Sequence, residues 1–116
     1  MKTLKTFYFD FYIKTKLSRS EFIQKIEKAL NIQLPPYEGN EYEDGEAWRS
    51  DFLGTYVTLI YEAEDDAYYL MGSANERIRG TIADDVELDE INISEMIFVL
   101  LSIVLSDTEA DIMIVE

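Results

Sequence analysis

The chain has 116 residues without cysteine or histidine, and its 24 acidic and 10 basic side chains give a formal net charge of −14. The lack of cysteine excludes a disulfide framework and thiolate chemistry, and the lack of histidine removes the commonest general base and metal ligand. Because 47% of the residues are apolar and 13% are aromatic, a hydrophobic core can form, and the length fits a single domain over residues 1–116.

The charge is unevenly distributed along the chain. Residues 1–36 contain seven basic and three acidic side chains, whereas residues 37–116 contain three basic and 21 acidic ones. Such a negative field repels nucleic acid and attracts a cationic partner. Solubility is the simpler explanation, although the charge exceeds the magnitude of about 2–8 that suits a small soluble domain.

The sequence also bears on where the protein works. Its first residues lack the continuous apolar core of a signal peptide. The longest apolar run falls far short of the ~20 residues that a membrane span needs, and the acidic surface disfavours anionic membranes. We therefore expect a cytoplasmic protein without a membrane partner.

Two elements are predicted near the start of the chain. Apolar residues alternate with tyrosines and charged residues over 5–14, which is typical of a strand. Ser18 and Glu21 have the spacing of a capping box, and an apolar stripe at helical spacing follows them. A helix is therefore predicted over about residues 18–31, before two prolines that prevent its continuation.

The middle of the chain reads as a loop followed by a hairpin. Glycine and asparagine favour a loop over 37–50. β-branched and aromatic residues predict strands over 52–62 and 67–72, joined by an acidic turn at 64–66. Residues 76–85 give a weaker signal for a short third strand.

A second helix and a last strand are predicted towards the end. Asn92 and Glu95 repeat the capping-box spacing, and Ile91 and Met96 have the spacing of a hydrophobic staple. The segment from Met96 to Leu105 is apolar on every side, which predicts a helix over about 92–106 that is buried on most of its surface. With a strand at 111–116, the order is β-α-β-β-(β)-α-β. This order indicates an α+β fold with a mostly antiparallel sheet and two helices packed on it.

The sequence gives no specific sign of catalysis. It contains no nucleophile elbow, phosphate-binding loop or dinucleotide-binding motif. Neighbouring carboxylates such as Asp65 with Asp66, or Asp84 with Asp85, could form an acid–base pair or bind a divalent cation. No spacing rule distinguishes them from solvated turns. We expect a protein that is not an enzyme and has no cofactor or metal.

Two segments combine carboxylates with aromatic residues, namely YEGNEYEDGEAW at 37–48 and YEAEDDAYY at 61–69. Protein interfaces use aromatic side chains as anchors and charges for steering. In the competing interpretation, the aromatic residues of 37–48 fold back onto the core, and a mixture with Trp48 buried and Tyr42 exposed is also open. The residues predicted to bind a partner are Tyr37, Glu38, Glu41, Tyr42, Glu43, Asp44, Glu46, Trp48, Asp65, Asp66, Asp84 and Asp85.

In its length, its lack of cysteine and histidine, its acidic part after residue 36 and these two segments, the chain resembles bacterial immunity proteins of toxin–immunity systems, such as those of contact-dependent growth inhibition. The resemblance implies a 1:1 complex in which an acidic surface masks the active site of a basic toxin domain, typically a nuclease, without catalysis. The alternatives are an acidic DNA mimic or other interaction module, and a small carboxylate-based enzyme or ligand-binding domain.

Overall fold

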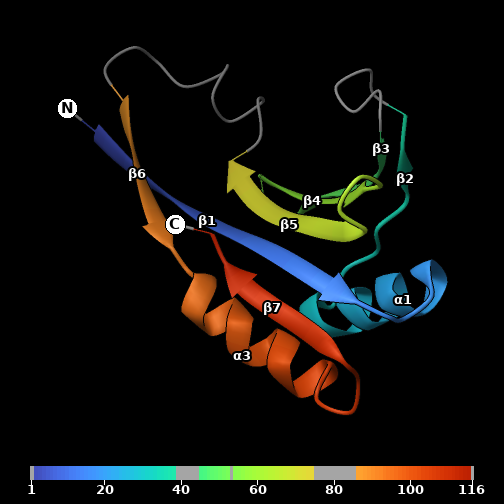
Figure 1. The fold of residues 1–116 in the computed structure, drawn as a ribbon. Helices are drawn as coiled ribbons and strands as arrows, with labels where there is room; N and C mark the ends of the chain where they lie inside the picture. Colours follow the sequence, from blue (N-terminus) through green and yellow to red (C-terminus); the bar gives the residue numbers. More distant parts are fainter. Residues whose placement is uncertain (1, 39–44, 53, 75–85, 116) are drawn as a thin grey trace.

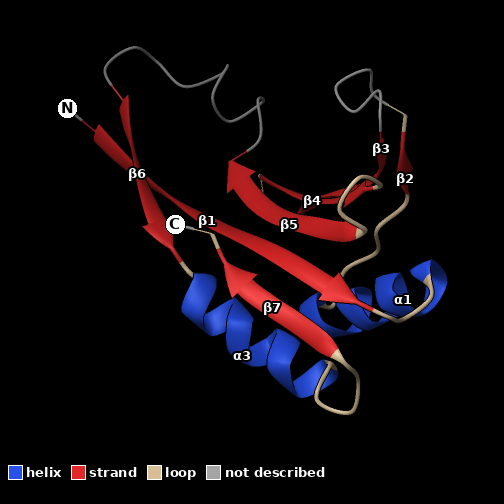
Figure 2. Cartoon of the chain, in the orientation of Figure 1, coloured by secondary structure: helices blue, strands red, loops and turns tan. Residues whose placement is uncertain are grey.

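A computed structural model describes residues 2–38, 45–52, 54–74 and 86–115. These residues form a seven-stranded, mostly antiparallel sheet, with two helices packed on one side of it (Figure 1, Figure 2). The predicted α+β class is confirmed. The elements in chain order are β1 (Lys2–Thr15), α1 (Arg19–Leu30), β2 (Pro36–Tyr37), β3 (Gly45–Phe52), β4 (Thr55–Glu62), β5 (Ala67–Ala74), β6 (Val86–Asn92), α3 (Ser94–Val104) and β7 (Ala110–Ile114).

The long strand β1 organises the sheet. The strand order in the sheet is β2-β3-β4-β5-β1-β6, and β7 also pairs with β1. On the side away from β5, the first half of β1 pairs with β6 in parallel and the second half pairs with β7 in antiparallel fashion. Because β6 and β7 lie end to end along one strand, the connecting helix α3 runs beneath the second half of β1 (Figure 1).

The core lies between the sheet and the helices. Alternate residues of β1 point to opposite faces, and Phe9, Phe11 and Ile13 point toward the helices. Phe22 and Ile26 of α1 meet them from the helical side and are fully buried. The remaining members of this buried cluster are Leu34, Trp48, Val57, Leu59, Tyr68, Leu70, Ile97, Leu101 and Leu105.

The first helix follows the prediction. Ser18 is the N-cap of α1, its hydroxyl accepts the Glu21 N–H at 3.3 Å, and the same hydroxyl donates to Glu21 Oε1 at 3.0 Å. The helix ends at Asn31, whose left-handed backbone (φ 54°) completes the C-cap. The N-cap and the boundaries predicted from sequence are therefore confirmed, although Glu21 pairs with the Ser18 hydroxyl and not with the backbone N–H that a full capping box would use.

The predicted loop over 37–50 is partly wrong, because β3 begins at Gly45. Ala47 and Trp48 are buried, and β3 pairs with β4 along its whole length. The strand predicted over 52–62 accordingly begins at Thr55, after Gly54 turns the chain with a φ of 78°. Glycine adopts this left-handed conformation readily, so the chain can turn at Gly54 between β3 and β4. The strand predicted from sequence ran through this turn.

The start of the second helix differs from the prediction. The Asn92 side chain accepts the Ser94 N–H at 2.9 Å from within β6, and Ile93, the actual N-cap, makes no side-chain capping bond. The proposed staple is also absent at Met96, which is exposed. The expectation that this helix is buried on most of its surface is wrong as well, because one whole face is open to solvent.

The turn over 64–66 and the hairpin of β4 and β5 are confirmed, and the last predicted strand corresponds to β7. The weak strand predicted over 76–85 lies outside the described residues. Strand β6 was not predicted, since its alternating acidic residues resemble a solvated segment and its pairing partner is the distant β1.

Gly72→Ala is expected to destabilise the fold by about 1–3 kcal/mol. A Cβ at this position of β5 would overlap the ring of Phe9, lying only 2.7 Å from Cζ, and Phe9 is itself buried. Urea unfolding measures the change. Ser73→Ala on the exposed side of the same strand is the control and should change stability by no more than about 0.5 kcal/mol.

Candidate protein-binding surface

Strand pairing brings the two acidic–aromatic segments to one end of the sheet. In β3 and β4 the residue Glu46 lies opposite Tyr61, and in β4 and β5 Tyr61 lies opposite Tyr68. The neighbouring row contains Glu62 opposite Ala67. Residues 45–48 and 61–69, which are separate in sequence, therefore lie side by side at one end of the sheet.

The turn between β4 and β5 concentrates exposed carboxylates at this end. Glu64, Asp65 and Asp66 are all exposed. Asp66 has a positive φ of 49°, and its Oδ1 accepts the Tyr61 hydroxyl at 2.7 Å, which raises the pKa of Tyr61. This bond ties the turn to β4, so the carboxylates project from a fixed backbone.

Arg19, the first residue of α1, lies beneath this surface. Its guanidinium pairs with Glu46 Oε2 at 2.6 Å and lies 4.6 Å from the ring centre of Tyr61 and 5.7 Å from that of Trp48. Burial raises the pKa of Tyr68, and a hydrogen bond to Arg19 opposes that shift. Cation–π contacts and an ion pair therefore join α1 to β3 and β4, and the hydrogen bond to Tyr68 joins it to β5.

The sheet face opposite the helices, called the outer face below, carries a second aromatic group. The rings of Tyr12 and Tyr69 meet edge to face, with centroids 5.1 Å apart. Burial raises the pKa of both hydroxyls, and the negative charges of Glu62 and Asp65 raise it further. The field of the acidic turn therefore reaches across the outer face to β1.

A second arginine is held on the outer face by aromatic rings. The Arg49 guanidinium lies 4.2 Å from the ring centre of Tyr37 and 4.6 Å from that of Tyr56. Its Nε–H donates to Thr58 Oγ1 at 3.2 Å. The guanidinium groups of both arginines in the described ranges thus lie against aromatic rings of the protein itself.

The structure places the predicted partner-binding residues in different environments. Trp48 belongs to the core with 7% of its surface exposed, as the fold-back interpretation expected. Tyr37 is half-buried beside Arg49, while Glu38 and Glu46 are exposed. Asp65 and Asp66 share the acidic turn described above. The other predicted residues lie outside the described part of the chain, namely Glu41, Tyr42, Glu43, Asp44, Asp84 and Asp85.

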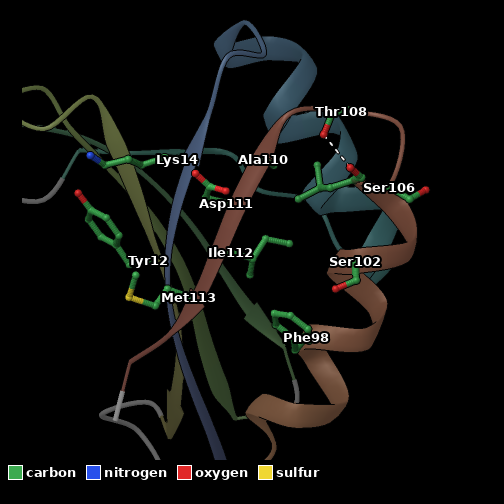
Figure 3. Close-up of a pocket in the computed structure, with 11 residues that line it drawn as sticks. Tyr12, Lys14, Phe98, Ser102, Ser106, Thr108, Ala110, Asp111, Ile112 and Met113 are labelled. Carbon is green, nitrogen blue, oxygen red and sulfur yellow. Dashed lines mark hydrogen bonds between the residues drawn. The ribbon is translucent and has the colours of Figure 1, made fainter.

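A groove of about 790 Å³ follows β7, between β1 and α3. Tyr12 and Met113 lie on one side of β7, and Ile112 lies on the other side, where Phe98 projects from α3 (Figure 3). The Thr108 hydroxyl donates to the Leu105 carbonyl at 2.8 Å, so it is engaged by the end of α3. This groove joins the outer face, and its polar lining residues include Lys14, Asp111, Ser102 and Ser106.

The described residues contain no cluster of three or more potential metal-binding side chains. None of the helices they form is both long and apolar enough to cross a membrane. No protein-family model matches the chain, and no curated protein is significantly similar to it in sequence.

The residues predicted to bind a partner did not include Arg19, Tyr12 or Tyr69, although Tyr69 belongs to the acidic–aromatic segment 61–69. The alternation in β1 places Tyr12 on the outer face, but only the register with β5 brings Tyr69 beside it. Arg19 follows the N-cap by one position, and nothing in the local sequence indicates that its side chain reaches β3 and β4.

Arg19→Met is expected to lower the free energy of unfolding by about 1–2 kcal/mol, because it removes the positive charge that contacts two aromatic rings and pairs with Glu46. Trp48 is the single tryptophan, so its fluorescence reports both the change beside its ring and the unfolding transition. Lys28→Met, in the last turn of the same helix, is the matched control and should cost only a few tenths of a kcal/mol. Equal losses in the two variants would contradict the structural role of Arg19.

Asp10→Asn is expected to stabilise the protein at neutral pH. Burial raises the pKa of Asp10 above 3.8, and its Oδ1 has no hydrogen-bond partner among the described residues. Ionisation of Asp10 therefore opposes folding at neutral pH, and this cost disappears as the pH falls through the raised pKa towards 3.8. The gain should be under about 1 kcal/mol, because solvent screens a partly exposed group, and it should vanish in urea titrations near pH 3.5.

Proposed function

We propose that the chain is a stoichiometric immunity protein that binds a basic toxin domain, a nuclease, and masks its active site. The observation that carries this proposal is the joining of residues 45–48 and 61–69 into one acidic and aromatic end of the sheet. A protein of this kind acts in the cytoplasm, where its toxin would reach nucleic acid, and it acts by binding without catalysis.

The charges of this surface suit a nuclease cleft. Such a cleft attracts phosphates through lysine and arginine side chains. Glu64 and Asp65 are exposed on the turn, and Glu46 is exposed beside it. Carboxylates presented this way can occupy phosphate positions and steer the encounter, which gives rapid association at low salt.

The rigidity of the surface favours tight binding. The turn is held by the bond from Tyr61 to Asp66, and the strands on either side are paired along their length. A preformed contact surface loses little conformational entropy when a partner binds. Its carboxylates therefore need little reordering to meet a cationic cleft.

Aromatic side chains beside the turn supply the other part of an interface. Tyr12 and Tyr69 contact one another on the outer face, within the field of Glu62 and Asp65. Tyrosines of this kind often anchor interfaces, because they bury much area and have few rotatable bonds. They would slow dissociation, while the acidic turn would speed association.

The double variant Glu64→Lys with Asp65→Lys is expected to weaken binding to the toxin domain encoded by the neighbouring gene. Asp66 is left unchanged because it stabilises the turn. Reversal of two exposed charges should lower the association rate by about tenfold or more at low salt, as measured by stopped-flow mixing. The rate for the unaltered protein should fall steeply as salt increases.

The matched control is Glu87→Lys with Asp89→Lys, which changes the net charge equally on exposed positions of β6. This control should bind at nearly the rate of the unaltered protein. Equal losses in both variants would show that only the overall charge matters. Failure to bind the neighbouring toxin, or an association rate independent of salt, would contradict the proposed function.

A further inference from the structure

Strand β7 leaves one of its edges open. It pairs with β1 and with no other strand in the described part of the chain. Val115 donates its N–H to the Asp10 carbonyl at 2.9 Å, and hydrogen-bonded pairs recur at every second residue of an antiparallel ladder. Met113 therefore also bonds to β1, whereas the N–H and C=O groups of Ile112 and Ile114 point away from it. Each of these two residues offers one donor and one acceptor to a further strand.

The two strands at the ends of the strand order, β2 and β6, are protected against such pairing. β2 is two residues long and begins with Pro36, which cannot donate a hydrogen bond. β6 carries exposed carboxylates at Glu87, Asp89 and Glu90. Proline, short length and charged side chains are the means by which proteins protect sheet edges. β7 has neither proline nor lysine, and Asp111 is its single charged residue.

The groove of about 790 Å³ follows this open edge. Ile112 lines it, so a residue whose backbone groups point outward also faces the space beside the strand. Phe98 and Ser102 line it from α3, and Figure 3 shows Phe98 projecting from the helix toward β7. Space for an additional strand is therefore present beside β7, with α3 as one wall.

Burial beside this edge is incomplete. In the neighbouring strand β1, Phe11 and Ile13 are fully buried. Ile112, Ile114 and Phe98 pack against the same buried cluster but remain partly exposed. A strand added to β7 would cover these three side chains with its own core-facing residues, and burial of apolar surface favours association.

We propose that an extended segment of the toxin domain adds to the open edge of β7 as a further strand, an inference that rests on the function proposed above. Strand addition uses main-chain hydrogen bonds for affinity and side-chain contacts for specificity. The inward side chains of the added segment would be apolar, where they meet Phe98 and Ile112. An outward side chain beside Asp111 would be basic, because Asp111 is exposed and has no ion pair among the described residues.

The open edge is continuous with the acidic–aromatic end of the sheet, and this continuity identifies the toxin as the source of the strand. Tyr12 lines the groove, and its ring contacts Tyr69 of the acidic–aromatic segment. Tyr68 of β5 and Ile112 of β7 both pair with Ile13 of β1, so they lie about 10 Å apart, or two strand spacings. A partner that covers the turn and the outer face therefore reaches β7.

Charge favours the toxin over a second copy of the chain. Two copies would each carry a net charge of −14 and would repel one another at long range. The same field attracts a basic domain. The edge is thus disfavoured for pairing with another copy and available to the toxin.

Amide hydrogen exchange in the labelled full chain, alone and with the unlabelled toxin domain encoded by the neighbouring gene, tests the proposal. The amides of Ile112 and Ile114 should exchange rapidly in the free protein and at least about a hundredfold more slowly in the complex. The Met113 amide, which the register bonds to β1 in both states, is the internal control. It should be protected with and without the toxin.

Ile112→Pro removes an outward N–H but leaves the ladder to β1 intact, and it should raise the dissociation rate at least about tenfold with the association rate nearly unchanged. Leu88→Pro is the matched control in β6. The bond from the Ile93 N–H to the Tyr8 carbonyl shows that, in the parallel register, the Leu88 N–H also points away from β1. This control should bind like the unaltered protein. Ser102→Trp, which fills the groove from α3 without changing a strand, should also raise the dissociation rate, and circular dichroism checks that all three variants fold.

The outcomes separate this proposal from the proposed function. Toxin binding with unchanged exchange at Ile112 and Ile114 would overturn the added strand and leave the proposed function standing, as would equal dissociation rates for Ile112→Pro and Leu88→Pro. Absence of any complex would overturn both. Slower exchange of the two amides as the concentration of the chain rises, without toxin, would assign the edge to a second copy and overturn the toxin strand.

Discussion

The pairing of β1 on both of its edges is the constraint on which the rest of the structure depends. One edge pairs with β5, and the other is divided between β6 and β7. The same strand presents Phe9, Phe11 and Ile13 to both helices. Because β6 and β7 share one side of β1, α3 must bridge them, and this fixes its position over the core and the direction of its exposed face.

The few arginines in the described residues show how an acidic chain uses its positive charge. Arg19 and Arg49 are both held by aromatic rings of the protein, and Arg19 also joins α1 to three strands. Burial is the main cause of the raised pKa values of Tyr12 and Tyr69, and the negative charges of Glu62 and Asp65 raise these pKa values further.

Local patterns predicted local structure, and pairing determined the rest. The alternation of β1 and the Ser18–Glu21 box could be read directly, because each depends on residues that are close in sequence. The start of β3 could not be predicted, because the local sequence around Trp48 favours a loop and the strand depends on pairing with β4. Helix α3 was misjudged for a similar reason. Apolar residues on all sides indicate what a helix could bury, whereas the actual burial depends on the number of elements around it.

The order in which the strands appear in the chain has a consequence for folding during synthesis. β1 leaves the ribosome well before its partners β5, β6 and β7, which begin at residues 67, 86 and 110. Helix α1 follows directly and can cover part of its apolar face, but both edges of β1 stay unpaired until these later strands have been synthesised. Such long-range pairing slows folding and extends the time during which a nascent strand can associate wrongly. The alternating tyrosines and charged residues of β1, on the face away from the core, would keep this segment soluble until its partner strands have been synthesised.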